Sequence, residues 1–276
     1  VGDPCQLPPV QETISPAMMP DYFKSEFGIK PHEAELTEIM RQKDGNDLIR
    51  VSHLLRKQRA LMPDTESYYN RQIMWARFPL RNCRNTHIHT DMNEMLNSYI
   101  EDVKQNGYNN SIFICASNKK CYDISTTVRG LLNFNNSLQK GDLLMVIQNN
   151  NTSGLMNGDM VEIENIDSHM EIRANLIFQE AVVRELFTGQ SKSVLLLTST
   201  ITSGILNLDT HQQTELFLDF IYRMRAVGIN QKQNERQFNK KMQTDPYLNA
   251  LRCMYGYAIT SHKAQGGEWN NVYVDF

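Results

Sequence analysis

The sequence has few cysteines, no long apolar run and no excess of positive charge. Its five cysteines are scattered over 276 residues without a CxxC pair or a metal-ligand spacing, which argues against a disulfide framework and predicts a reduced, cytoplasmic protein. No apolar run approaches the roughly 18 residues that a membrane-spanning helix needs, so we expect no membrane association. The formal net charge is −3, from 28 basic and 31 acidic residues, so any nucleic-acid binding must come from local patches.

The phosphate-binding motif G-x-x-x-x-G-K-[ST] is also missing. Residues 189–193 (GQSKS) repeat only its end, and no Asp-Glu pair at a strand end offers ligands for Mg²⁺. We therefore expect negligible ATP hydrolysis from this polypeptide alone. The chain begins with Val1 and not with Met, which is typical of a sequence that starts inside a longer protein.

The densest group of chemically active side chains lies near the C-terminus, between Thr260 and Glu268. Hydroxyl, imidazole, ammonium, carboxamide and carboxylate groups, with two glycines, directly follow the apolar residues 255–259. This pattern predicts a buried strand with polar groups at its C-terminal end, where open α/β sheets bind their ligands. An ordinary strand followed by a solvated turn is the alternative.

The stretch Thr260-x-His262-Lys263-x-Gln265-Gly266-x-Glu268 resembles motif V of superfamily 1 DNA helicases of the RecD and Dda type. Residues 1–10 (VGDPCQLPPV) resemble motif III of that family, and residues 36–42 (LTEIMRQ) resemble motif IV. Residues 140–150 and 157–159 are similar to its inserted SH3-like barrel. The matches occur in the family's order, which makes them more specific together than singly.

The resemblance implies an α/β fold with a RecA-like second motor domain, of the P-loop NTPase type, and an inserted small SH3-like β-barrel. On this division, residues 1–16 are the tail end of the first RecA-like domain and residues 17–34 are a connector. Residues 35–138 and 246–276 form the second motor domain, and residues 139–245 hold the barrel with a helical segment after it.

The resemblance also implies catalytic roles for Gln6, Arg41 and Gln265. The Gln6 amide would sense the terminal phosphate, the Arg41 guanidinium would be an arginine finger on the γ-phosphate, and Gln265 would couple nucleotide to DNA. The implied cofactors are ATP and Mg²⁺, with the Mg²⁺ ligands outside this chain, and the nucleotide contacts would come from Gly266, Gly267 and Glu268. A proline-rich turn at residue 6 and a surface arginine at residue 41 are the alternatives.

Two segments are candidates for contacts with single-stranded DNA. By resemblance, Thr260 and His262 would donate to the DNA backbone. The apolar strand 111–116 is followed by a helix start, whose first amides are unpaired, so phosphate contacts are expected there from Ser117, Asn118 and Lys119. Ordinary N-capping by Asn118 is an equally good interpretation of that corner.

Three other patterns carry weaker predictions. Residues 57–86 interleave Arg with aromatic residues, which suits either single-stranded nucleic acid or a surface loop. Residues 232–241 hold the best basic patch, which is more often a solvated helix face than a DNA grip. His87 and His89 could be two zinc ligands on a strand face, but no Cys or carboxylate cluster adjoins them, so we predict no metal site.

Hydrophobic periodicity predicts helices over 48–59, 91–103, 117–132 and 209–224. Asp91-x-x-Glu94 has the pattern of a capping box at the start of the second of these helices, Gly107 is expected to stop it, and Asp209 or Thr210 is expected to cap the fourth. Short strands separated by Asn- and Gly-containing turns are expected at 143–148, 160–166, 171–178, 181–186 and 193–198. These strands support the predicted barrel.

The sequence therefore predicts a fragment of an ATP-dependent DNA helicase that moves along single-stranded DNA and unwinds duplexes in repair or recombination. Its partners would be single-stranded DNA and the N-terminal motor domain of the parent protein. The first alternative is a non-catalytic module that binds single-stranded nucleic acid and carries vestigial motor motifs. A metabolic α/β enzyme with His262 as its base is a weaker alternative, because the chain lacks a paired nucleophile or carboxylate.

Overall fold

A computed structural model describes residues 15–34, 47–60 and 83–275 of the chain, which divides into two compact units, 1–94 and 95–276. The first unit contains a short 3-10 helix, η1 (Pro16–Met18), and the helices α1 (Pro20–Phe27) and α2 (Asp47–Ala60). The expected connector 17–34 thus includes a helix. Pro20 is its first residue, where a missing N–H costs nothing, and Gly28 ends it with φ 65°.

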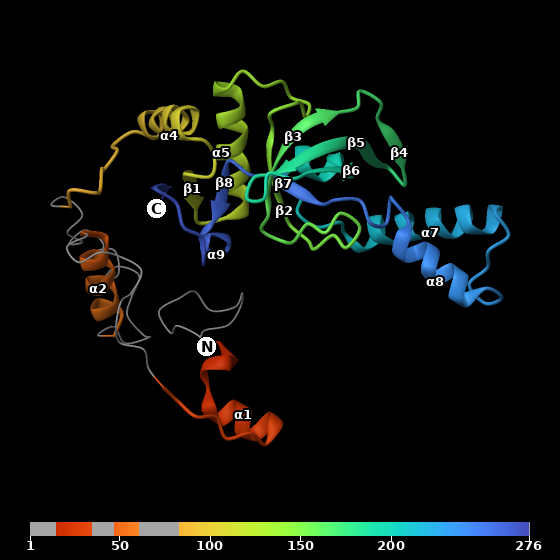
Figure 1. The fold of residues 1–276 in the computed structure, drawn as a ribbon, viewed down its shortest axis with the longest axis horizontal. Helices are drawn as coiled ribbons and strands as arrows, with labels where there is room; N and C mark the ends of the chain where they lie inside the picture. Colours follow the sequence, from red (N-terminus) through yellow and green to blue (C-terminus); the bar gives the residue numbers. More distant parts are fainter. Residues whose placement is uncertain (1–14, 35–46, 61–82, 276) are drawn as a thin grey trace. The chain divides into compact units, whose positions relative to one another are not determined.

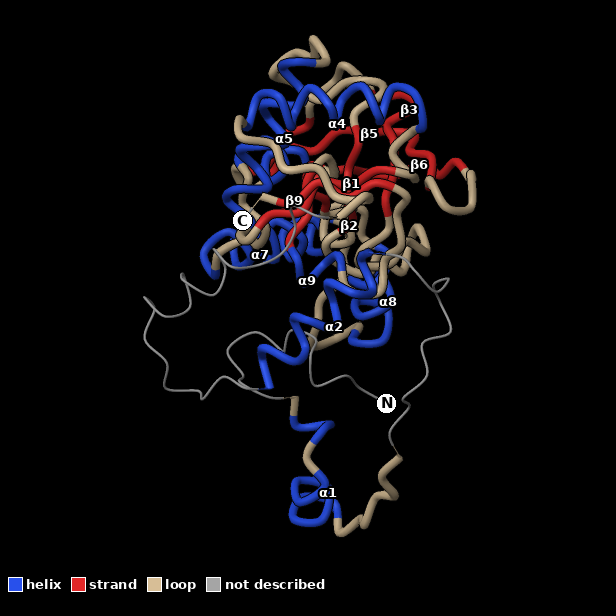
Figure 2. The backbone as a smooth tube through the Cα atoms, turned by 90° about the vertical axis from the view of Figure 1, so that its left-hand side faces the viewer, coloured by secondary structure: helices blue, strands red, loops and turns tan. Residues whose placement is uncertain are grey.

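The second unit contains two sheets, and its strands are grouped with helices around them (Figures 1 and 2). Sheet A is parallel, with the order β8 (Ala258–Thr260), β1 (Ser111–Cys115), β9 (Asn271–Val274). Strand β1 is almost wholly apolar because it lies between two neighbours and under helices. This parallel sheet confirms the predicted α/β class.

Two helices cover sheet A. Helix α4 (Met92–Asn106) begins at the end of the first unit, and its buried Tyr99 packs edge-on against Phe113 of β1 and Tyr273 of β9. Helix α5 (Asn118–Leu131) follows β1 and lies beside β8. The expected helix stop at Gly107 is confirmed, with φ 80°.

Sheet B is antiparallel and follows the order β4 (Glu171–Arg173), β5 (Leu176–Glu185), β3 (Met160–Ile166), β2 (Leu143–Val146), β7 (Cys253–Tyr255). Strand β6 (Ser191–Leu197) pairs with β5. The sheet curls, and a single parallel bridge from Leu196 to Leu251 joins β6 to the residues before β7. A closed SH3-like barrel stays a prediction, as does the division into motor domain and insertion.

The prediction of strands at 171–178 and 181–186 was wrong in its turn position. The chain reverses at Ala174 and Asn175, which have φ 47° and 58°, and β5 then runs unbroken past Gln179 and Glu180. Two consecutive residues with positive φ form the hairpin turn that matches strand twist. The polar pair Gln179-Glu180 does not interrupt the strand, because Gln179 is buried and its side chain donates to the Asp167 carbonyl.

The apolar run 255–259 was predicted as one strand, but it is divided between the two sheets. Strand β7 belongs to sheet B and β8 to sheet A, and the chain crosses at Gly256 and Tyr257. A Cβ on Gly256 would lie 3.0 Å from the Leu144 carbonyl carbon and 2.8 Å from Met160. Glycine is therefore required because the two backbones approach closely.

The remaining helices are α6 (Thr198–Ser203), α7 (Thr210–Ala226), α8 (Glu235–Thr244) and the four-residue α9 (Ser261–Ala264). The expected start of α7 is confirmed by a full capping box between Asp209 and Gln212. Helix α6 and strand β9 were not predicted. No described helix has the length and apolar character to cross a bilayer. Of the described cysteines, Cys115, Cys121 and Cys253 are buried free thiols, and Cys83 is buried with its sulfur accepting from Arg50.

Candidate nucleic-acid and nucleotide interface

The structure brings the two candidate DNA-contacting segments to one edge of sheet A. Strands β1 and β8 are parallel neighbours, and Cys115 lies opposite Thr260 in their register. The residues that follow, Ser117–Lys119 and Thr260–Glu268, therefore leave adjacent strand ends in the same direction (Figure 1). We call these two segments the sheet A edge.

Ser117 forms the start of helix α5. Its extended backbone (φ −141°, ψ 155°) is that of an N-cap, and its hydroxyl oxygen accepts from the Lys120 backbone N at 3.2 Å. The capping alternative thus holds for this corner, but the cap is Ser117 and not Asn118. Asn118 and Lys119 occupy the exposed first turn, where their side chains and the first backbone amides can meet an anion.

Thr260 repeats this arrangement on the neighbouring strand. Its hydroxyl oxygen accepts from the Lys263 backbone N at 3.4 Å and so caps α9. His262, in that short helix, is exposed. Each strand of the pair therefore ends in a hydroxyl-capped turn with an exposed polar or basic side chain just beyond it.

The Lys263 side chain points toward sheet B, so it does not share the position of His262 at the sheet A edge. Its ammonium group contacts the Asn157 side-chain oxygen in the loop between β2 and β3. Partial burial lowers the pKa of Lys263. A residue of the stretch that resembles motif V thus contacts the segment 157–159, which resembles part of the inserted barrel, so a direct contact joins the two sheets at this point.

The four predicted residues after α9 form an exposed turn, Gln265–Glu268. Gly266 has φ 82°, which favours glycine. A Cβ on Gly267 would come within 2.0 Å of the Trp269 ring, so a larger residue there would have to displace the indole. The predicted approach of a nucleotide at Gly267 stays a prediction.

Gln6 and Arg41 lie outside the described residues, as does most of the stretch 57–86. The roles that the resemblance implies for Gln6 and Arg41 therefore stay predictions. The basic patch is described: Lys232, Arg236, Lys240 and Lys241 are exposed on or just before α8. The buried residue of that helix, Phe238, packs on Phe220 of α7 at 5.1 Å between ring centroids, and Met242 packs against the same cluster.

Sequence reasoning missed a buried polar network behind the sheet A edge. The Arg129 guanidinium of α5 donates to both Asp142 oxygens, at 2.7 and 2.8 Å, and these side chains are 6% and 0% exposed. Burial acts to lower the pKa of Arg129, but the hydrogen bonds and charge of Asp142 outweigh it and raise that pKa. The only sequence signal was an arginine beside Val128 on the apolar face of a helix.

Tyr257 extends this network to the crossing between the sheets. Its hydroxyl donates to Asp142 at 3.0 Å and accepts from the Leu143 backbone N at 3.1 Å, while its carbonyl accepts from the Tyr99 hydroxyl at 2.8 Å. Burial is the main cause that raises the pKa of Tyr257, so its hydroxyl stays protonated. The network therefore fixes α4, α5 and β2 to the chain just before β8.

A cavity of about 730 Å³ lies on sheet B, away from the sheet A edge. Among the described residues that line it, the charged ones are Asp167 and Glu180. A lining without a basic side chain does not suit a phosphate backbone. We therefore assign it no part in nucleic-acid binding.

Comparison with known proteins does not identify a family for this chain. No family model matches the chain, and no curated protein matches it. A solved structure with some likeness is that of Pif1 helicase from Bacteroides in complex with ADP-AlF3 and ssDNA, which is 11% identical with a TM-score of 0.32. The match covers 77% of this chain and 53% of that one, so this chain spans about half its length. At these values the likeness assigns no role to any residue, and the RecD or Dda type stays a prediction.

Proposed function

We propose that this chain is part of the motor of a superfamily 1 DNA helicase of the RecD and Dda type. The observation that carries the proposal is the register of β1 and β8, with Cys115 opposite Thr260. It places Ser117–Lys119 beside the stretch that resembles motif V, although some 140 residues separate them in sequence. A parallel sheet that gathers two hydroxyl-capped turns at one edge suits contacts with a phosphate backbone that ignore base sequence.

In this proposal the sheet A edge holds single-stranded DNA, and the turn Gln265–Glu268 faces ATP bound mainly by the rest of the parent protein. Gln6 and Arg41 complete the nucleotide site, with Mg²⁺ held outside this chain. Because one short segment contacts both ligands, closing of the nucleotide site moves Thr260 and His262 relative to the DNA. Opening after hydrolysis then resets the grip one step further along the strand.

The DNA half of the proposal is tested by binding to a labelled oligothymidine, measured by fluorescence anisotropy at fixed salt. We expect His262→Ala and Lys119→Ala each to weaken binding about tenfold, because each removes a hydrogen bond to a charged phosphate. Lys104→Ala and His211→Ala remove the same groups from exposed sites on α4 and α7 and are expected to change nothing. Equal losses in all four variants would point to diffuse charge and contradict a site at the sheet A edge.

The ATP half needs the full-length parent. There, Gln265→Ala or Arg41→Ala is expected to abolish DNA-stimulated ATP hydrolysis, with a loss of about 10³-fold or more for the arginine. Gln148→Ala, an exposed amide in the loop after β2, serves as the control for Gln265. Unchanged turnover in the Gln265 and Arg41 variants would refute these assignments. A parent without any DNA-stimulated hydrolysis would favour the non-catalytic nucleic-acid-binding module.

A further inference from the structure

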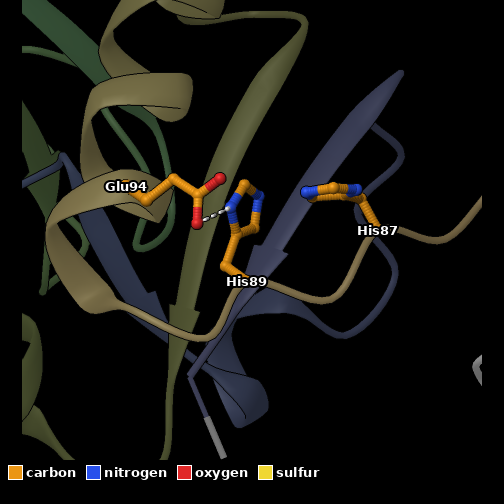
Figure 3. A group of neighbouring side chains, drawn as sticks. All are labelled: His87, His89 and Glu94. Atoms are coloured by element: carbon orange, nitrogen blue, oxygen red, sulfur yellow. Dashed lines mark ion pairs between the residues drawn. The ribbon is translucent and has the colours of Figure 1, made fainter.

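A cluster of three potential metal ligands lies in the first unit, and the proposed motor function does not use it. His87, His89 and Glu94 each offer one ligand atom, and these atoms lie within 4.8 Å of one another. Figure 3 shows the two imidazoles and the carboxylate turned toward a common region. The sequence prediction of no metal site rested on the lack of a carboxylate beside the histidines, and the fold supplies that carboxylate.

Local backbone structure explains how the three side chains meet. Residues 86–89 are outside any helix, and the two imidazole rings of His87 and His89 contact each other at 4.4 Å between centroids. Helix α4 begins three residues after His89, and its first turn carries Glu94 back toward the histidines. The Glu94 Oε2 atom lies 3.8 Å from His89 Nδ1. A capping box was predicted at this helix start. In the structure the Asp91 carboxylate accepts from the Asn93 backbone N, while the Glu94 side chain extends to His89 (Figure 3).

A buried ring nitrogen without a hydrogen-bond partner supports a ligand-binding role for this cluster. The His89 side chain is only 12% exposed, and its Nδ1 is buried with no hydrogen-bond partner, since 3.8 Å is too long for one. The hydroxyl of Thr86, three residues earlier, is likewise buried and unpartnered. Buried polar atoms nearly always have a partner, and two such atoms in one short segment call for an explanation. An ion bound to Nδ1 would supply the partner that His89 lacks.

We propose that His87, His89 and Glu94 bind a zinc ion. Two imidazoles and a carboxylate are a donor set that zinc takes in proteins, with a water in the fourth position. At zinc–ligand distances of about 2.0–2.2 Å, ligand atoms in a tetrahedron lie about 3.3–3.6 Å apart, so small side-chain rotations close the site. His87 and Glu94 are exposed and can make them. The ion would fasten the segment 86–89 to the start of α4.

The test is titration of the whole 276-residue chain with Co²⁺ as a visible substitute for Zn²⁺, followed by displacement with Zn²⁺. We expect one equivalent to bind with the absorption of a nitrogen- and oxygen-ligated ion, without the thiolate band that the cysteines would give. His87→Ala, His89→Ala and Glu94→Gln are each expected to weaken binding at least tenfold. Mg²⁺ is expected not to compete, because it prefers oxygen ligands.

Two controls make the result decisive. His169→Ala removes an exposed histidine from the loop between β3 and β4 and is expected to leave Co²⁺ affinity unchanged. The Glu94→Gln variant keeps shape and hydrogen-bonding capacity, so its circular dichroism is expected to match that of the wild type. Co²⁺ binding that survives both His89→Ala and Glu94→Gln, or no one-to-one binding by the wild-type chain, would overturn the proposal. DNA binding and ATP hydrolysis play no part in these readouts, so the motor proposal stands or fails separately.

Discussion

Replacing Asp142 with alanine is expected to lower the free energy of unfolding of the second unit by about 3–5 kcal/mol. The change leaves the Arg129 guanidinium buried without its counter-charge, since the two Asp142 oxygens accept from it at 2.7 and 2.8 Å. It also removes the acceptors of the Tyr257 hydroxyl and of the Gln139 backbone N. Urea denaturation followed by circular dichroism measures the loss.

A matched control is Asp123→Ala, which removes an exposed carboxylate from α5 and is expected to stay within about 0.5 kcal/mol of wild type. A double-mutant cycle of Asp142→Ala with Arg129→Met separates the pair from its surroundings. We expect a coupling of about 0.5–3 kcal/mol, because the double variant no longer buries a lone charge. Strict additivity of the two losses would mean that the pair does not act as a unit.

Replacing Phe238 with alanine is expected to destabilise the α7–α8 hairpin by about 3–5 kcal/mol. Phe238 is 2% exposed and is the buried residue of α8, where it completes a small cluster with Phe220 and Ile229. Deleting its ring leaves a cavity between the helices and releases the helix that carries the basic patch. Hydrogen exchange of the amides of residues 235–244 is expected to accelerate accordingly.

The same substitution at Phe187 provides the control. That ring is 96% exposed after β5, so Phe187→Ala is expected to change stability by no more than about 0.5 kcal/mol. Protected amides in α8 of the Phe238→Ala variant would show that other contacts hold the helix. In that case the basic patch would not depend on this ring for its position.

Much of the local structure could be predicted because it depends on neighbouring residues. The capping box at Asp209, the glycine stop at Gly107 and the apolar strand 111–115 depend on side chains within a few positions of one another. The errors came where local signals were ambiguous. The expected strands left Gln179 and Glu180 in a gap between them, whereas the turn lies at Ala174-Asn175, where both residues have positive φ and neither is glycine.

The candidate site, too, has a part that the sequence predicts and a part that only the fold reveals. The residues of the motif V stretch and the corner at Ser117 were predicted from the sequence, because strand ends and helix starts are recognisable from residue type. The adjacency of these two segments was not predicted, since it depends on the pairing of β1 with β8 across a separation of some 140 residues. The capping hydroxyl of Ser117 and the contact from Lys263 to Asn157 also became apparent only in three dimensions.

The sequence alone determined the type of most elements, many of their starts and ends, and the chemical character of the sheet A edge, because these follow from short-range periodicity and capping. Tertiary structure alone decided that β7 and β8 belong to different sheets, that Arg129 and Asp142 are a buried pair, and that Glu94 joins two histidines. The physical reason is distance along the chain. Contacts between remote residues are fixed by burial and strand register over the whole unit, and no local pattern specifies them.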